Sequence, residues 1–173
     1  MLLQASVSDA REFTARYDAH KKAIFNYILY RIGFDHATAE DLTSEIFLKA
    51  YEHFDSYDRA RPFKTWIFAI AHNHLVNHFT SRKVTLPLDE AIEVVKAVPL
   101  TDAIDTSMAM AKVLSIVDSL PPASRDLVIM RYVNDLTYTE IADITHKEEG
   151  AIRTALSRAL ETLRTQLSHE SPL

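Results

Sequence analysis

The chain has 173 residues, of which 47% are hydrophobic and 25% are charged, and its formal net charge is −5. It contains two glycines and no cysteine, which excludes a turn-rich β protein, disulfide bonds and thiolate metal sites. The N-terminal residues lack the basic start and long apolar core of a secretion signal, and no apolar run is long enough to cross a bilayer. We therefore expect a cytoplasmic protein without a membrane partner, built as one medium domain or two small ones.

The sequence predicts an amphipathic helix in the first third of the chain. Apolar side chains recur at helical spacing between Phe13 and Ile32. Ser8 or Asp9 can cap the start of this helix through a side-chain oxygen. Gly33 is expected to end it, because glycine accepts a left-handed backbone.

A second helix is predicted to open at Asp35 or Thr38. Its outer face is charged, and in most helices such a face is simply solvated. Its inner face is expected to carry four apolar residues, namely Ala39, Leu42, Ile46 and Ala50.

Residues 59–83 contain no Asp or Glu, although the whole protein is acidic. Cations attract phosphates and aromatic rings stack on unpaired bases, so this composition favours binding of single-stranded nucleic acid. The alternative for the rings is plain packing in a core, above all for Trp66. The basic side chains are Arg59, Arg61, Lys64, Arg82 and Lys83, and the interleaved rings are Phe63, Trp66, Phe68 and Phe79.

Three histidines in this stretch, His72, His74 and His78, raise the question of a metal site. Two of them stand four residues apart, which can place two imidazoles on one ion. No acidic residue lies nearby to complete a site, so we expect no metal and predict histidines that face solvent or DNA.

Two strings carry a family resemblance: TAEDLTSEIFL at residues 38–48 and RPFKTWIFAIAHN at residues 61–73. They resemble region 2 of bacterial sigma factors of the extracytoplasmic-function (ECF) group, although Ser44 stands where the family often has Gln. The resemblance implies that the second helix docks on the β′ clamp helices of RNA polymerase core through Asp41, Leu42, Ser44, Glu45 and Lys49.

The same resemblance implies that the loop before Pro62 and the next helix open the −10 promoter element. Melting there needs a pocket that holds a flipped base of the non-template strand. The residues implied in −10 binding and melting are Asp58, Arg59, Ala60, Arg61, Phe63, Lys64, Trp66, Asn73, Arg82 and Lys83.

Residues 84–101 contain two prolines and an acidic patch, which is typical of a linker. From about residue 102 a second helical domain is predicted, with an apolar stripe from Ile104 to Val117. Leu120-Pro121-Pro122 restarts the chain into a helix whose inward residues are expected to be Leu127, Met130 and Val133.

A helix-turn-helix is predicted near the C-terminus. Thr137 and Glu140 have the spacing of a capping box, in which each side chain satisfies a free backbone amide. A short helix over residues 138–144, a tight turn and a longer helix over residues 149–167 then follow. In such a motif the second helix enters the major groove of DNA.

This segment resembles sigma region 4, through LP at 120–121, MRY at 130–132, LTYTEIA at 136–142 and GAIRTALSRA at 150–159. His146 stands where the family's turn has glycine, and histidine tolerates the left-handed conformation better than most residues. The resemblance implies contacts to the −35 element by Lys147, Glu149, Gly150, Arg153, Thr154, Ser157 and Arg158.

Besides His146, four further positions depart from the family pattern in this motif. Glu148 and Glu149 place negative charge at the start of the recognition helix, Lys147 replaces an apolar residue, and Ala155 replaces a common arginine. Because carboxylates repel phosphates, we expect −35 contacts that are weaker or different. The alternative for the polar residues of this helix is an ordinary solvated surface.

The sequence thus predicts an all-α protein with a region 2-like domain at 1–83, a linker at 84–101 and a region 4-like domain at 102–173. The resemblance implies a sigma factor without enzymatic activity or cofactor. Its implied partners are RNA polymerase core, through the β′ clamp helices and the β flap, promoter DNA and an anti-sigma factor.

Two alternatives of other classes remain open. One is a stand-alone helix-turn-helix regulator, which would need dimer symmetry and a palindromic site. The basic and aromatic residues of 59–83 argue against it, because a protein that reads duplex DNA needs no surface for single strands. The other is a sigma-like interaction module without promoter recognition, for which Glu148, Glu149 and Ala155 are the supporting features. An enzyme is disfavoured, because no nucleophile, phosphate loop or metal cluster stands out.

Overall fold

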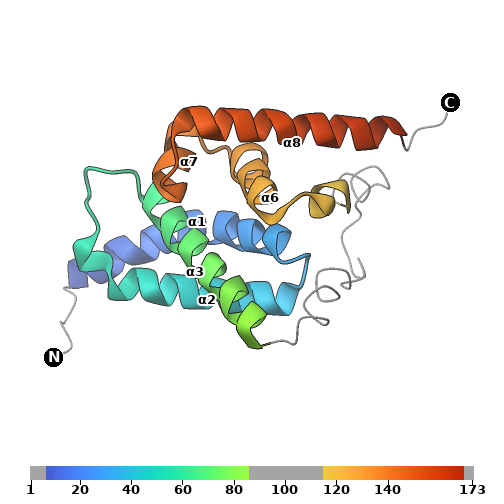
Figure 1. Cartoon of the computed structure of the whole chain (residues 1–173). Coiled ribbons are helices and arrows are strands. Elements are labelled where there is room, and N and C mark those ends of the chain that lie inside the picture. Colours follow the sequence, from blue (N-terminus) through green and yellow to red (C-terminus); the bar gives the residue numbers. More distant parts are fainter. Residues whose placement is uncertain (1–6, 86–114, 170–173) are drawn as a thin grey trace. The chain divides into compact units, whose positions relative to one another are not determined.

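The computed structural model describes residues 7–85 and 115–169, with side chains described within 9–81 and 115–168. All elements in these ranges are helical, so the predicted all-α fold is confirmed (Figure 1). The chain divides into two compact units, Met1–Lys96 and Ala97–Leu173. Most of the expected linker at 84–101 and of the apolar stripe between Ile104 and Val117 lies outside the described residues.

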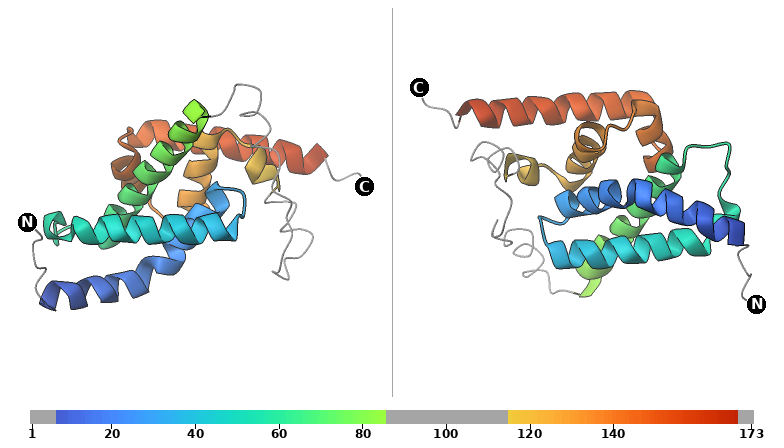
Figure 2. Two further views of the ribbon diagram at one scale, coloured as in Figure 1. Left: turned by 90° about the horizontal axis from the view of Figure 1, so that it is seen from below. Right: turned by 180° about the vertical axis from the view of Figure 1, so that it is seen from behind.

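The first unit is a three-helix arrangement. Helices α1 (Val7–Arg31) and α2 (His36–Glu52) run side by side, and α3 (Phe63–Thr85) packs across both of them (Figure 2). The short 3₁₀ helix η1 (Phe54–Ser56) follows α2. The three helices share a core in which the largest fully buried side chains are Ile24, Tyr27, Ile28, Ile46, Ile67, Phe68 and Leu75.

The turn between α1 and α2 follows the sequence prediction. Gly33 has φ +78°, a left-handed conformation that ends α1. Asp35 caps α2, since its Oδ1 accepts a hydrogen bond of 3.1 Å from the backbone N–H of Thr38. The expected inner face is confirmed, with Ala39, Leu42, Ile46 and Ala50 all buried.

The predicted cap of α1 is wrong. The helix already begins at Val7, so Ser8 and Asp9 lie within its first turn instead of preceding it. The side chain of Asp9 pairs with Arg59 of the loop between α2 and α3.

The second unit is built around the long helix α8 (Glu149–His169). Helices α6 (Pro122–Val128) and α7 (Tyr138–Thr145) both pack against it. The predicted capping box is present at the start of α7: the Thr137 hydroxyl accepts from the Glu140 amide at 3.2 Å, and the Glu140 carboxylate accepts from the Thr137 amide at 2.7 Å.

A π-helical turn, η2 (Ile129–Val133), extends α6 and changes which residues face the core. Leu127 and Met130 are buried as predicted, but Val133 is 39% exposed, so its predicted inward position is wrong. The amide of Asn134 bonds to the carbonyl of Ile129, five residues back. A turn with five-residue spacing rotates the following side chains relative to an α-helix, which carries Val133 out of the core.

A buried arginine ties α6 to the segment before it. Arg125 is 8% exposed, and its Nη1 lies 2.6 Å from the Asp118 carboxylate. Its Nη2 also donates to the backbone carbonyl of Asp118. A buried guanidinium needs such partners, because an unpaired charge in a core is strongly destabilising.

None of the helices within residues 7–85 and 115–169 is both long enough and apolar enough to cross a membrane.

The turn of the helix-turn-helix depends on the backbone of His146, which has φ 55° and ψ 38°. This left-handed conformation confirms the expectation for that position. His146→Val should destabilise the second unit by about 1–2 kcal/mol, because β-branched residues fit this conformation poorly, whereas His146→Gly should not. Urea unfolding of the full chain, monitored by circular dichroism, measures the stability of both variants. Equal stability of the valine and glycine variants would contradict this account of the turn.

Candidate nucleic-acid and partner-binding surfaces

The loop that joins α2 to α3 is anchored by buried aromatic rings. Phe54 and Phe63 are each 2% exposed and Tyr57 is 4% exposed. The rings of Tyr57 and Phe63 meet edge to face with centroids 5.4 Å apart, and the half-buried Trp66 lies 5.0 Å from Tyr57. The Tyr57 hydroxyl also donates a hydrogen bond of 2.6 Å to the carbonyl of Arg61. These contacts fix both ends of the loop.

Phe63 and Trp66, the two aromatic residues expected to bind the −10 element, differ in burial. Phe63 lies in the core and can support the loop only from beneath. Trp66 keeps part of its surface accessible, but it also packs on Phe54, Tyr57 and Phe63. The structure thus gives both rings a packing role, as the core-packing alternative predicts for Trp66.

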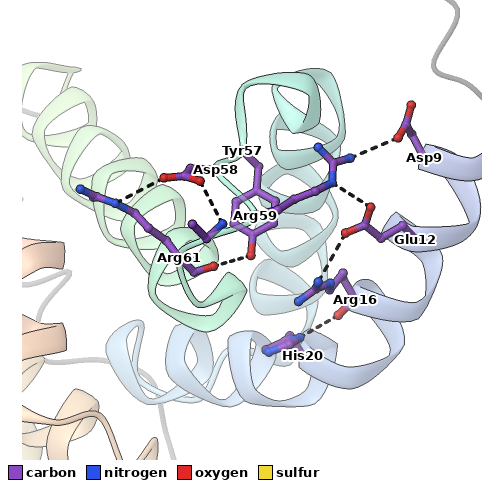
Figure 3. Close-up of polar contacts among 9 residues, drawn as sticks. Asp9, Glu12, Arg16, His20, Tyr57, Asp58, Arg59 and Arg61 are labelled. Atoms are coloured by element: carbon purple, nitrogen blue, oxygen red, sulfur yellow. Dashed lines mark hydrogen bonds and ion pairs between the residues drawn. The ribbon is translucent and has the colours of Figure 1, made fainter.

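The residues between the anchors project into solvent. Asp58, Ala60 and Arg61 are exposed, and Asp58 Oδ1 accepts a hydrogen bond of 2.9 Å from the Ala60 amide, which shapes the turn (Figure 3). The side chain of Arg61 is 79% exposed, and its Nε lies 3.9 Å from Asp58 Oδ2. A pair this long and this exposed contributes little, so Arg61 is an available cation.

Arg59 is held by α1. Its Nε lies 3.0 Å from Glu12 Oε2 and its Nη2 lies 3.1 Å from Asp9 Oδ1 (Figure 3). The guanidinium also sits over the ring of Phe54 at 5.2 Å. The hydrogen bond with Glu12, with the charges of Glu12, Asp9 and Asp55, raises the pKa of Arg59 above its usual value. Sequence reasoning missed both α1 acids.

The remaining −10 candidates are spread along α3. Lys64 is half-buried near the start of the helix, while the exposed Asn73 stands ten residues beyond Phe63, about 15 Å along the axis at 1.5 Å per residue. Arg82 and Lys83 belong to the C-terminal part of α3, and their side chains lie outside the described residues. Among the side chains that are described on this helix, Lys64 and Asn73 therefore lie at different points along its axis.

The outer face of α2 presents four of the five candidates for core binding. Asp41, Ser44, Glu45 and Lys49 are exposed, but Leu42 is 3% exposed and belongs to the core. Leu48 lies on the exposed side of the same helix and is 60% exposed. Sequence reasoning missed this apolar side chain, although its place between outward positions was readable from the helical period.

His74 bridges two of these residues from α3. Its Nε2 lies 2.9 Å from Glu45 Oε2 and its Nδ1 lies 2.7 Å from Lys49 Nζ. A lysine ammonium only donates, so Nδ1 accepts and Nε2 carries the proton that bonds to Glu45. The His74 side chain is 11% exposed, so the expectation that it faces solvent or DNA is wrong.

Within the parts of the chain that the structure describes, no group of three or more His, Cys, Asp or Glu side chains could hold a metal ion.

The second unit contains the predicted helix-turn-helix, formed by α7, the turn at His146 and α8. Ile141 and Ile144 of α7 and Ile152 and Leu156 of α8 are buried, which locks the two helices together. Glu149 is half-buried, and the other −35 candidates are exposed, namely Lys147, Gly150, Arg153, Thr154, Ser157 and Arg158.

Gly150 has no internal reason to be glycine. A Cβ at this position would meet no atom within 4 Å, and its φ is not in the left-handed range. Packing within the unit therefore does not require glycine at this position.

The negative charge of Glu149 is compensated by neighbouring side chains. Its Oε1 accepts from Arg153 Nε at 3.1 Å and also from Arg153 Nη2, and its Oε2 accepts from the Thr139 hydroxyl at 3.0 Å. The hydrogen bonds from Arg153 and Thr139 lower the pKa of Glu149 below its ordinary value. Glu149 thus has partners within the unit, whereas Glu148 is exposed, and a −35 contact by Glu149 stays a prediction.

Two family comparisons match the two units. Sigma-70 region 2 matches residues 16–85, and sigma-70 region 4 matches residues 110–163. Together the matches cover more than half of the chain, in the order in which the sequence strings predicted them.

Individual relatives agree. The chain is 33% identical to the ECF RNA polymerase sigma factor BldN of Streptomyces coelicolor, over 97% of this chain and 65% of that protein, so it spans about two thirds of the length of BldN. It is 27% identical to the ECF sigma factor SigW of Bacillus subtilis, over 95% of this chain and 93% of SigW.

The fold also matches a solved sigma factor. RpoE of Bartonella quintana, in complex with the anti-sigma factor NepR, superposes with a TM-score of 0.79 at 21% identity, over 93% of this chain and 99% of that one. The chain therefore belongs to the sigma-70 family of RNA polymerase sigma factors, in its ECF group.

Proposed function

We propose that this protein binds RNA polymerase core, recognises the −10 and −35 elements of promoters and helps to melt promoter DNA. The observation that carries the proposal is the presence, in one chain, of an anchored and exposed basic loop in the region 2 unit and a helix-turn-helix in the region 4 unit. The protein performs no covalent chemistry. Melting is driven by the binding of unpaired bases and by contacts with polymerase.

The −10 element is assigned to the loop between α2 and α3. Its exposed residues, Asp58, Ala60 and Arg61, offer hydrogen-bonding groups and a cation at fixed positions, because the buried ring of Tyr57 holds the loop. A rigid loop lowers the entropy that is lost when a flexible single strand is captured. Asn73, which is exposed on α3, extends this surface along the same helix.

Core polymerase is assigned to the outer face of α2. Its exposed acids and Lys49 surround the apolar side chain of Leu48, which is the mixed composition of a docking surface. His74 connects Glu45 to Lys49 and keeps the two side chains in place. Leu42 supports this face from within the core.

The −35 element is assigned to α8. The first turns of the helix carry Arg153, Thr154, Ser157 and Arg158 on exposed positions, and the bare backbone at Gly150 leaves room for a DNA strand. Half or more of the contacts in such interfaces go to phosphates, which these side chains can bind.

Regulation by an anti-sigma factor and a cytoplasmic location follow from the same proposal. Two structural neighbours are bound to partner proteins, RpoE to the anti-sigma factor NepR and CnrH to the cytosolic domain of CnrY. A protein that works with RNA polymerase on the chromosome acts in the cytoplasm.

The proposal is tested by run-off transcription with bacterial core polymerase, fragmented genomic DNA of the source organism, and the protein added or withheld. New discrete transcripts whose start sites share upstream elements support it. Binding to core without transcripts favours the interaction-module alternative, and no binding to core favours the stand-alone regulator.

Arg61→Ala and Asn73→Ala should each impair open-complex formation while core binding stays intact. Both side chains are exposed, so their loss removes a DNA contact and no core packing. Permanganate footprinting of the melted region measures opening, and co-elution with core measures assembly. Arg164→Ala, an exposed charge on α8, is the matched control. Loss of core binding in the first two variants, or normal opening, would count against these roles.

Asp9→Asn/Glu12→Gln should tighten binding of the single-stranded −10 non-template sequence by the protein–core complex, by about two- to fivefold at low salt. The α1 carboxylates occupy Arg59 and compete with DNA phosphates for it, and their removal frees the guanidinium.

Asp18→Asn/Glu161→Gln is the control for this change, because it removes the same total charge from exposed side chains that do not pair with Arg59. Fluorescence anisotropy with a labelled oligonucleotide compares the two. Weaker binding by the Asp9/Glu12 variant than by the control would mean that the two acids position Arg59 for DNA and do not mask it.

A further inference from the structure

Glu149 and Arg153 form the most complete polar cluster on the recognition helix. Both carboxylate oxygens of Glu149 are engaged, Oε1 by Arg153 and Oε2 by the Thr139 hydroxyl of α7. The carboxylate therefore cannot rotate away from the arginine without losing Thr139. This contact crosses the helix-turn-helix, from the first turn of α7 to the first turn of α8.

The guanidinium of Arg153 is also fixed from a second direction. Its Cζ lies 4.2 Å from the centroid of the Tyr138 ring, a distance typical of a cation–π contact. Tyr138 is held in turn by Arg131, whose Cζ lies 5.0 Å from the same ring and whose Nη1 donates to the carbonyl of Leu136 at 3.0 Å. A side chain with two fixed neighbours has little rotamer freedom left to lose on binding.

These contacts use one edge of the Arg153 guanidinium and leave a second edge without a hydrogen bond. Nε and Nη2 face Glu149, while Nη1 has no hydrogen-bond partner within residues 115–168. The edge formed by Nη1 and Nη2 is thus available. An arginine edge of this kind binds O6 and N7 of guanine in the major groove, which is the commonest base-specific contact in protein–DNA complexes.

The position of the pair on the helix agrees with such a contact. Glu149 is the first residue of α8 and Arg153 stands one turn later on the same face. In helix-turn-helix proteins the N-terminal residues of the recognition helix reach the base edges. A carboxylate beside the arginine also lowers the net charge at this point, which reduces attraction to phosphates and favours the base contact.

We propose that Glu149 is a positioning residue: it orients Arg153 so that this arginine reads a guanine in the −35 element. The inference rests on the proposed function and adds a source of sequence specificity to it. Glu149 does not itself contact DNA in this account. It acts through Arg153, and Thr139 fixes its own orientation.

The experiment uses the full chain with core polymerase and a promoter library that is randomised at −35, with sequencing of the run-off transcripts. The wild-type protein is expected to enrich guanine at one position, and Arg153→Ala to lose that preference. Glu149→Ala should reduce the preference at the same position by roughly tenfold. Glu149→Gln should retain part of it, because the amide oxygen still accepts from Arg153.

Glu148→Ala is the matched control, since it removes the same charge one residue earlier, from a side chain that is exposed. It should leave the guanine preference unchanged. In an Arg153→Ala background, Glu149→Ala should have no further effect on specificity, because a positioning residue has nothing left to position.

Three results would overturn the inference. One is an equal gain in activity on every −35 sequence in the alanine and glutamine variants of Glu149, which would show a simple charge effect. Another is the same loss of preference in the Glu148→Ala control. The third is a wild-type protein that transcribes from the library without selecting any −35 sequence. Failure of the proposed function itself looks different, since no transcript then depends on the added protein.

Discussion

The burial of three aromatic rings, Phe54, Tyr57 and Phe63, is the constraint on which the geometry of the first unit depends. They pack on one another and on α1, where Phe13 meets Phe54 edge to face at 5.2 Å. Because the rings lie at the ends of the loop between α2 and α3, their burial fixes its ends and leaves residues 58–61 exposed. A loop with polar residues alone would not hold Arg61 and Ala60 at defined positions.

In each unit, carboxylates hold one arginine of the proposed DNA-binding surface, with different consequences. Arg59 is bound by two acids from α1, which occupy its Nε and Nη2 donors. Arg153 is bound by Glu149 along one edge, and its outer edge stays available. Surface ion pairs contribute little to stability, typically below about 1 kcal/mol, so their effect lies in the direction and availability of the guanidinium. In the proposed function, the two acids limit the contact of Arg59 with DNA, whereas Glu149 directs Arg153 toward a base.

Local features were predictable from the sequence because their causes lie within a few residues. The cap at Asp35, the left-handed Gly33 and His146, and the capping box of Thr137 and Glu140 all follow from residue type and spacing. The family strings supplied both units and their order. The rings of residues 59–83 showed the limit of composition, since Phe63, read as part of a nucleic-acid surface, is buried.

Contacts between distant segments were not predictable. Glu12 meets Arg59 across 47 positions, and His74 meets Glu45 across 29, so no local pattern signals either pair. The outward turn of Val133 depends on a π-helical bond pattern that hydrophobic periodicity does not encode. Thr139 and Glu149 are ten residues apart, and only the folded turn brings their side chains together.

In the proposed function, the anchored loop contacts the single strand of a melted promoter. Site-specific photo-crosslinking tests it most directly, with a photoreactive phenylalanine analogue at the exposed Ala60 and, as control, at the exposed Ala15 of α1. Open complexes of the Ala60 variant with core polymerase should crosslink to the non-template strand within the −10 element, and the Ala15 variant should not. Open complexes that form without a crosslink from Ala60, or with a crosslink only to duplex DNA, would contradict the assignment of this loop.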